Sequence, residues 1–115
     1  MGKLTTHMLD TAVGKPGSGI PISLYRIADG RHLVTSATTN SDGRTDLPLL
    51  EGDAFTLGTY ELQFSVGEYF KRTGASDAEP AFLDDVVIRV NLIADDHYHI
   101  PLLASPWSYS TYRGS

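Results

Sequence analysis

Residues 97–115 read HYHIPLLASPWSYSTYRGS, and this stretch organises the interpretation of the whole chain. The ends of a domain are usually frayed unless something holds them in place. This end nevertheless carries two imidazoles, several aromatic rings, hydroxyl groups and a guanidinium. Side chains of an extended strand repeat every second residue, so His97 and His99 are expected to lie on one face. The stretch therefore predicts a strand with a convergent polar face.

The preceding sequence is typical of short strands separated by turns. Apolar alternation and β-branched runs predict strands on both sides of 105–106 and over residues 4–10, 20–27, 33–39, 60–66 and 86–93. Turn residues occupy 29–30 and 40–44, and only 68–72 is expected to form a helical turn. Seven or eight strands with one short helix predict an all-β fold, a two-sheet antiparallel sandwich, as a single domain over residues 1–115.

Composition excludes several classes of function. The chain has no cysteine, which rules out disulfides, thiolate catalysis and cysteine-bound zinc. Its formal net charge is −5 with 9 Lys and Arg residues, so we expect no binding to nucleic acid or to anionic membranes. The sequence shows no signal peptide and no peroxisomal C-terminal tripeptide, which favours a cytoplasmic location by elimination. The composition leaves a small-molecule partner open.

Histidines are the strongest candidates for chemistry. His7 lies near the start, and His97 and His99 lie near the end. A His-X-His spacing on a strand is compatible with zinc or copper, with His7 or Asp96 as a third ligand, but the spacing alone is weak evidence. A lone histidine is more often a half-exposed strand residue, and Arg44 in its turn is by default a solvated charge. No nucleophile elbow or phosphate-binding loop is present.

Four motifs in order resemble the transthyretin-like family, in its branch of 5-hydroxyisourate hydrolases. They are LTTHMLDT at 4–11, TNSDGR at 39–44, HYHIPLL at 97–103 and the terminal YRGS at 112–115. The terminal tetrapeptide separates the hydrolases of this family from its hormone carriers. The resemblance implies a sandwich of two four-stranded sheets. It also implies a homotetramer, a dimer of dimers whose sites lie in a channel between the dimers and whose tail is held by a neighbouring subunit.

The resemblance also implies an activity and its residues. The activity is hydrolytic ring opening of 5-hydroxyisourate to 2-oxo-4-hydroxy-4-carboxy-5-ureidoimidazoline in urate degradation, with no cofactor and no metal. Catalytic roles are implied for His7, Arg44, His99 and Ser115. Substrate contacts are implied for Arg44, Tyr112, Arg113 and Gly114. His97 matches a motif position without an assigned role.

These residues suit the hydrolysis of a ring amide, which needs a base, an oxyanion donor and an acid. We expect His7 or His99 to activate water, the two meeting across the sheets, and Arg44 to grip carbonyl oxygens with two hydrogen bonds. Ser115 would donate through its hydroxyl, and its carboxylate or Arg113 would fix the tail. Two alternatives remain open: a carrier that binds a small ligand without chemistry, and a metal-dependent hydrolase using His97 and His99.

Overall fold

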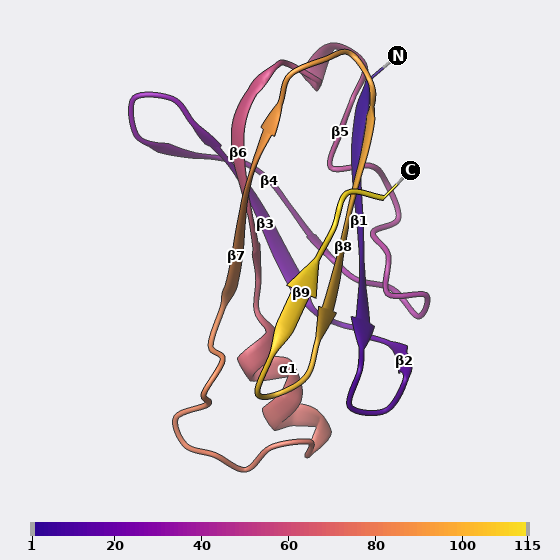
Figure 1. The fold of residues 1–115 in the computed structure, drawn as a ribbon, viewed down its shortest axis with the longest axis vertical. Coiled ribbons are helices and arrows are strands. Elements are labelled where there is room, and N and C mark those ends of the chain that lie inside the picture. Colours follow the sequence, from indigo (N-terminus) through magenta and orange to yellow (C-terminus); the bar gives the residue numbers. More distant parts are fainter. Residues whose placement is uncertain (1, 115) are drawn as a thin grey trace.

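Two packed β-sheets form the structure, a computed structural model that describes residues 2–114 (Figure 1). One sheet has the order β2-β1-β8-β9, with β5 also paired to β1, and the other has the order β4-β3-β6-β7. The strands are β1 (Lys3–Asp10), β2 (Lys15–Pro16), β3 (Pro21–Ile27), β4 (Arg31–Thr38), β5 (Leu50–Glu51), β6 (Gly58–Phe64), β7 (Val86–Leu92), β8 (His97–Ala104) and β9 (Tyr109–Thr111). The helices are α1 (Val66–Thr73) and a 3₁₀ turn, η1 (Gly52–Ala54).

The predicted all-β sandwich with one short α-helix is confirmed, with nine strands in the described residues where seven or eight were expected. The difference comes from β2 and β5, which are pairs of residues that hydrogen bond to β1. The segment containing β2, 14–19, is rich in glycine, a composition typical of loops. Two residues are too few to show a period-two pattern, so alternation has no means of detecting such strands.

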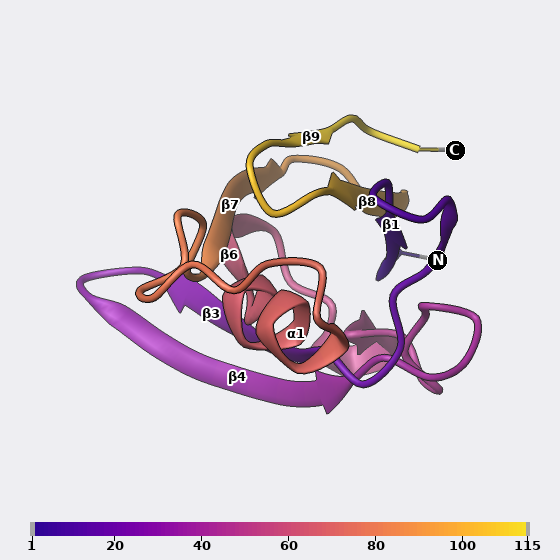
Figure 2. The ribbon, with the colours of Figure 1, turned by 90° about the horizontal axis from the view of Figure 1, so that it is seen from below.

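The alternation of inward and outward side chains along the strands places the core between the two sheets. Along β1 and β8, every second side chain is buried: Leu4, Thr6, Met8, Asp10, Tyr98, Ile100, Leu102 and Ala104. The opposite sheet contributes inward side chains such as Leu24, Tyr60 and Phe64. Seen from below, the two sheets face each other with α1 across the lower end of the sandwich (Figure 2). The alternate positions of β1 and β8 therefore point outward, and these positions hold the histidines.

One strand pair departs from the antiparallel expectation. β1 and β8 run parallel, with Lys3 opposite His97, Thr5 opposite His99 and His7 opposite Pro101, whereas every other pair of strands is antiparallel. A parallel pair needs a long crossover connection. Here the entire second sheet and α1 lie between the two strands in the chain. The first and last long strands thus become immediate neighbours.

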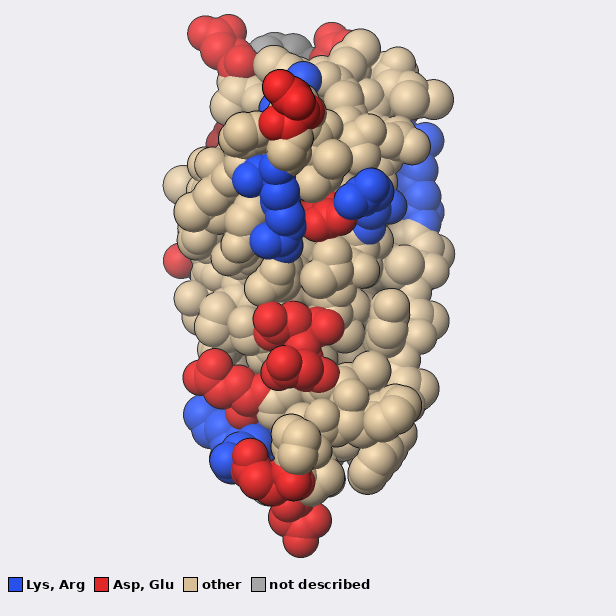
Figure 3. Space-filling view, turned by 90° about the vertical axis from the view of Figure 1, so that its left-hand side faces the viewer, with Lys and Arg blue, Asp and Glu red and all other residues tan. Residues whose placement is uncertain are grey.

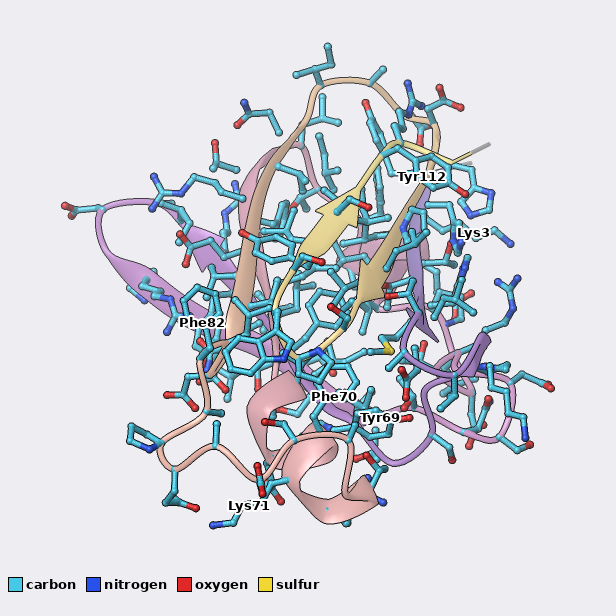
Figure 4. All side chains as sticks on the ribbon, turned by 60° about the horizontal axis from the view of Figure 1, so that its bottom comes forward. Lys3, Tyr69, Phe70, Lys71, Phe82 and Tyr112 are labelled. Atoms are coloured by element: carbon cyan, nitrogen blue, oxygen red, sulfur yellow. The ribbon has the colours of Figure 1, made fainter. Side chains whose placement is uncertain are left out.

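The α-helix closes the lower end of the sandwich. It contains the predicted helical turn at 68–72 and ends at Gly74, whose φ of 80° is a left-handed conformation that suits glycine. Tyr69 and Phe70 are buried and lie between α1 and the strands (Figure 4). The Tyr69 hydroxyl donates to Asp10 Oδ2 at 2.8 Å, which ties α1 to the end of β1. No helix within residues 2–114 is long and apolar enough to cross a membrane.

Candidate active site

Three histidines lie together on the outer face of the β1–β8 pair. His7 comes from β1, and His97 and His99 come from β8, all at half-buried outward positions. The predicted placement of His97 and His99 on one face is confirmed, because a single side chain, Thr5, contacts both of them. The parallel register is what brings the histidines of the two chain ends together.

His7 and His99 are in direct contact. His7 Nδ1 lies 2.7 Å from His99 Nε2, and the ring centroids are 4.8 Å apart with the planes inclined by 25°. The expectation that they meet across the sheets was wrong, because β1 and β8 belong to the same sheet. Alternation fixes which face a residue occupies but not which strand pairs with which. The pair is therefore set by the strand register and not by packing between layers.

Thr5 is a member of this cluster that the sequence analysis did not single out. Its hydroxyl lies 2.8 Å from His97 Nε2 and 2.8 Å from His99 Nδ1. It precedes His7 by two residues on β1, so the same period-two rule places both on one face. That spacing was the available signal, but a threonine beside a histidine carries no chemical signature of its own.

Arg44 reaches the cluster from the turn at 40–44. Gly43, at a φ of 74°, accepts a hydrogen bond on its carbonyl from Met8 N at 2.8 Å, and Asn40 Oδ1 accepts one from Arg44 N at 3.3 Å. These contacts place Arg44 opposite His7 in an antiparallel bridge. Opposed residues of a bridge project to the same face. Among residues 2–114, no carboxylate lies within 4.0 Å of the Arg44 guanidinium.

The electrostatics of the cluster keep His7 and His99 neutral. Burial lowers the pKa of His7 below its usual 6.5, and the charge of Arg44 lowers it further. The pKa of His99 is lowered to about 4, first by burial and then by the charges of His7, Arg44 and His97. Desolvation and a nearby cation both disfavour imidazolium. Both rings are thus uncharged near pH 7 and have a lone pair to offer.

The C-terminal tail packs on its own chain. Gly114 N donates to His99 O at 2.7 Å, and a Cβ on Gly114 would approach His99 Cδ2 to 2.8 Å, so only glycine fits. Arg113 forms an ion pair with Asp96 at 3.0 Å and lies 4.3 Å from the ring centroid of Tyr98. This agrees with the expected role of Arg113 in fixing the tail. The implied contact between the tail and a neighbouring subunit is not needed for these interactions.

Other predicted site residues lie apart from the imidazoles or outside the described residues. Tyr112, labelled in Figure 4, is 59% exposed. Together with Arg113 it borders a hollow that is also lined by Ile88 and Ile100. Ser115 lies outside residues 2–114, so its predicted role stays a prediction. Within the described residues, no group of three His, Asp or Glu side chains is arranged to hold a metal ion.

The fold and the histidine cluster together define a transthyretin-fold protein with a polar site on one outer sheet face. The profile described as the HIUase/Transthyretin family matches residues 4–114. The chain therefore belongs to this family.

Curated relatives and solved structures agree with this assignment. The chain is 56% identical to 5-hydroxyisourate hydrolase 2 of Rhizobium meliloti (strain 1021), over 99% of this chain and 97% of the relative. It is 57% identical to the 5-hydroxyisourate hydrolase of Pseudomonas aeruginosa, over 100% of this chain and 93% of the relative. The structure of Klebsiella pneumoniae 5-hydroxyisourate hydrolase superposes with a TM-score of 0.83 at 32% identity, covering all of both chains.

Two further structures show how widely the fold is used. (S)-allantoin synthase superposes with a TM-score of 0.92 at 46% identity, over 99% of this chain and 44% of that one, so the chain spans less than half of that protein. Transthyretin from Sparus aurata superposes with a TM-score of 0.86 at 23% identity, over 97% of this chain and 96% of that one. The predicted transthyretin-like sandwich is thereby confirmed.

Proposed function

We propose that this chain is a 5-hydroxyisourate hydrolase, a cyclic amide hydrolase of urate degradation. The substrate is 5-hydroxyisourate, whose six-membered ring is opened by water to give 2-oxo-4-hydroxy-4-carboxy-5-ureidoimidazoline. The observation that carries the proposal is the neutral His7–His99 pair, 2.7 Å apart, next to Arg44 on one outer face. Curated relatives more than half identical to this chain bear that name, which supports both the enzyme class and the substrate.

His7 is the proposed general base. Both ring nitrogens of His99 are engaged, Nε2 with His7 and Nδ1 with Thr5. His7 uses Nδ1 for His99, and its Nε2 has no hydrogen-bond partner among residues 2–114. A base must present a lone pair to the proton it removes. His7 Nε2 therefore takes a proton from water, while His99 orients the ring and shares the charge that develops on it.

Arg44 supplies the positive charge of the site. Its guanidinium is planar and permanently charged, which suits two hydrogen bonds to the carbonyl oxygens of an oxidised purine. Because no carboxylate within residues 2–114 neutralises it, its charge is available to a negative transition state. A permanent cation also explains why the base stays unprotonated, since the Arg44 charge lowers the pKa of His7.

Assembly is the second part of the proposal. A homotetramer, a dimer of dimers, would place the outer face of β1 and β8 in a channel between dimers. Half-buried Leu9 and Leu103 flank the histidines on this face and give it apolar area for such a contact. Enclosure would remove water around Arg44 and strengthen its field. The remaining tail positions, Tyr112 and Ser115, would then border the substrate, and the cytoplasmic location stays a prediction.

The test is the decay of freshly generated 5-hydroxyisourate, followed by ultraviolet absorbance with and without the protein. The reaction is repeated in ¹⁸O-labelled water, and the early product is identified by mass. Acceleration above spontaneous decay, with one labelled oxygen in a product one water heavier, supports the proposal. Spontaneous decay at an unchanged rate, together with tight binding of a purine-like ligand, would contradict it and favour a carrier.

Metal dependence is examined in the same assay. The protein is treated with a chelator, dialysed and analysed for bound metal before the rate is measured. Full activity without metal is expected, because the site offers a neutral base and a cation of its own. Loss of activity on chelation, with recovery on adding zinc, would overturn the mechanism through His7.

A further inference from the structure

His97 and Thr5 extend the catalytic pair into a line of four hydrogen-bonding groups. His7 Nδ1 lies 2.7 Å from His99 Nε2, and His99 Nδ1 lies 2.8 Å from Thr5 Oγ1. Thr5 Oγ1 in turn lies 2.8 Å from His97 Nε2. The proposed hydrolysis uses His7 and Arg44 directly and gives no task to His97 or Thr5. Both residues nevertheless continue the hydrogen-bonded line beyond His99, so their role remains to be explained.

A hydroxyl in the middle of such a line sets the direction of every bond in it. Threonine has one proton to donate, so Thr5 donates to one of its two imidazoles and accepts from the other. A neutral imidazole has one N–H and one lone pair, so each ring passes the same direction on. Polarisation along the line makes a mixed arrangement unfavourable. The line therefore has two uniform directions.

The two directions give His7 opposite properties. If Thr5 donates to His99, then His99 donates to His7 Nδ1 and the proton of His7 sits on Nε2. If Thr5 donates to His97, then His99 donates to Thr5 and His7 donates to His99. In the second case alone, His7 Nε2 is a lone pair. The hydrogen bonds at His97 thus decide whether His7 is able to act as a base.

We propose that Thr5 and His97 are positioning residues that hold the line in the direction in which His97 accepts from Thr5 and His7 Nε2 carries the lone pair. This inference rests on the proposed function, because it assigns a use to that lone pair. The direction itself is a property of the free protein. It is measurable without substrate.

The charges around the line favour this direction. Arg44 projects to the same face as His7, and a cation stabilises the tautomer that turns a lone pair toward it. At the other end, the charged neighbours of His97 are Asp96, Arg113 and Lys3. Asp96 and Arg113 are ion-paired with each other, and Lys3 is exposed to solvent. Arg44 has no carboxylate partner within residues 2–114, so its charge favours the same direction as the acceptor at His97.

Three variants separate this role from simple packing. His97→Leu removes the acceptor, so the Thr5 proton turns to His99 Nδ1 and the line reverses. We expect kcat to fall by about 10² with little change in KM, because the base is blocked while the substrate contacts remain. His97→Gln keeps an amide oxygen for Thr5 and should retain most of the rate. His32→Leu, at an exposed histidine of β4, is the matched control and should behave as wild type.

Thr5→Val tests whether His97 acts through Thr5. Valine has the shape of threonine without the hydroxyl, so it breaks the line and leaves the outer end disconnected. We expect a smaller loss of kcat than for His97→Leu, because no hydroxyl then donates to His99 Nδ1 and reverses the hydrogen bond between His99 and His7. Adding His97→Leu to Thr5→Val should cause no further loss. Multiplied effects in the double variant would show that His97 acts by another route and would overturn the proposal.

The direct readout is the tautomer of His7, measured by ¹⁵N NMR of histidine-labelled protein without substrate. The wild type should show His7 protonated on Nδ1, and His97→Leu should move the proton to Nε2 with the fold unchanged. A wild-type His7 protonated on Nε2, or a tautomer that ignores His97→Leu, would contradict the proposal. Because this spectrum needs no turnover, it remains decisive even if the protein fails to hydrolyse 5-hydroxyisourate.

Discussion

On the outer face of one sheet, Glu61 is held between two guanidinium groups, whereas beside the other sheet Arg44 stands next to three imidazoles. Glu61 lies 2.9 Å from Arg31 and 2.7 Å from Arg89, and its side chain is only 11% exposed. Basic and acidic side chains accordingly alternate on the side of the molecule at the left of Figure 1 (Figure 3). Arg44 has no such partner within residues 2–114.

The Glu61 cluster and the histidine cluster differ in how their charges are paired. The Glu61 cluster pairs its carboxylate with two cations, so it has little field left for a ligand and serves to join β4, β6 and β7. The histidine cluster keeps His7 and His99 neutral, and no carboxylate within residues 2–114 pairs with Arg44, so reactive groups are left available. Perturbed titratable groups beside an uncompensated charge are typical of functional sites. The comparison therefore favours a structural role for the Glu61 face and supports the chemistry proposed for the histidine face.

The largest expected effect comes from removing the partner of the base. His99→Leu leaves His7 without orientation and without a group to share its developing charge. We expect kcat/KM for 5-hydroxyisourate to fall by about 10² to 10⁴. The measurement is initial decay by absorbance at equal concentrations of folded protein, with His32→Leu as the control. A His99→Leu protein with the wild-type rate would remove the imidazole pair from the mechanism.

Removing the unpaired cation should come next. Arg44→Met keeps much of the length of the side chain and deletes its charge, and we expect kcat to fall by about 10² to 10³. The pKa of His7 should rise at the same time, since the Arg44 charge contributes to lowering it. Titration of the His7 ring by NMR checks the second effect. An unchanged or lower pKa in Arg44→Met would contradict the electrostatic account.

A smaller effect is expected at the tail. Gly114→Ala would bring a methyl group to 2.8 Å from His99 Cδ2, so the tail or the ring must shift. We expect a loss of about 10-fold in kcat/KM, because small displacements of catalytic groups are costly. Arg113→Lys tests the ion pair with Asp96 and should have a weaker effect. Wild-type kinetics for Gly114→Ala would mean that the tail does not govern the position of His99.

The sequence predicts those features of this site that depend on local patterns, but not those that depend on which strands pair. Period-two alternation was sufficient to place His97 with His99 on one face, and the turn at 40–44 was correctly predicted from its Asn and Gly residues. The contact between His7 and His99 depends on the parallel pairing of β1 and β8. That pairing joins opposite ends of the chain, and no local pattern encodes it. The sequence therefore indicated the histidines that cluster but not the layer in which they meet.

Thr5 and the tail show two further limits. Thr5 contacts both histidines of β8 only because the register sets it opposite His99. Gly114 needs its small size because of a close approach to His99, which again is a contact between separate segments. Residue types known for chemistry are visible in a sequence. Residues that serve by fit or by position become visible only when the strands are paired.

The smallest expected effects concern how the stability of the fold depends on pH, which should differ between the histidine face and the Glu61 face. The pKa of His99 falls from 6.5 in the unfolded chain to about 4 in the fold, so its neutral form adds stability above pH 6.5 that is lost as the pH falls toward 4. Hydrogen bonds from Arg89 and Arg31 lower the pKa of Glu61 below 4.5, so its contribution is present above pH 4.5 and lost only below it.

Urea unfolding between pH 3 and pH 8 tests this separation. His99→Leu should flatten the free energy of unfolding between about pH 4 and pH 6.5, and Glu61→Gln should flatten it only below about pH 4.5. At neutral pH, Glu61→Gln should cost about 1 kcal/mol, since its two partners are largely exposed to solvent. If both substitutions flattened the free energy of unfolding over the same pH range, this result would contradict the pKa assignments.

The most direct test of the central claim compares one substitution on each face, His7→Gln and Glu61→Gln, in the decay of freshly generated 5-hydroxyisourate at pH 7. Both exchange a titratable group for an amide, and both proteins are first shown to be folded. We predict that 5-hydroxyisourate decays near the spontaneous rate in the presence of His7→Gln and at the wild-type rate in the presence of Glu61→Gln. A His7→Gln protein with the wild-type rate, or a folded Glu61→Gln protein that has lost it, would contradict the assignment of chemistry to the histidine face.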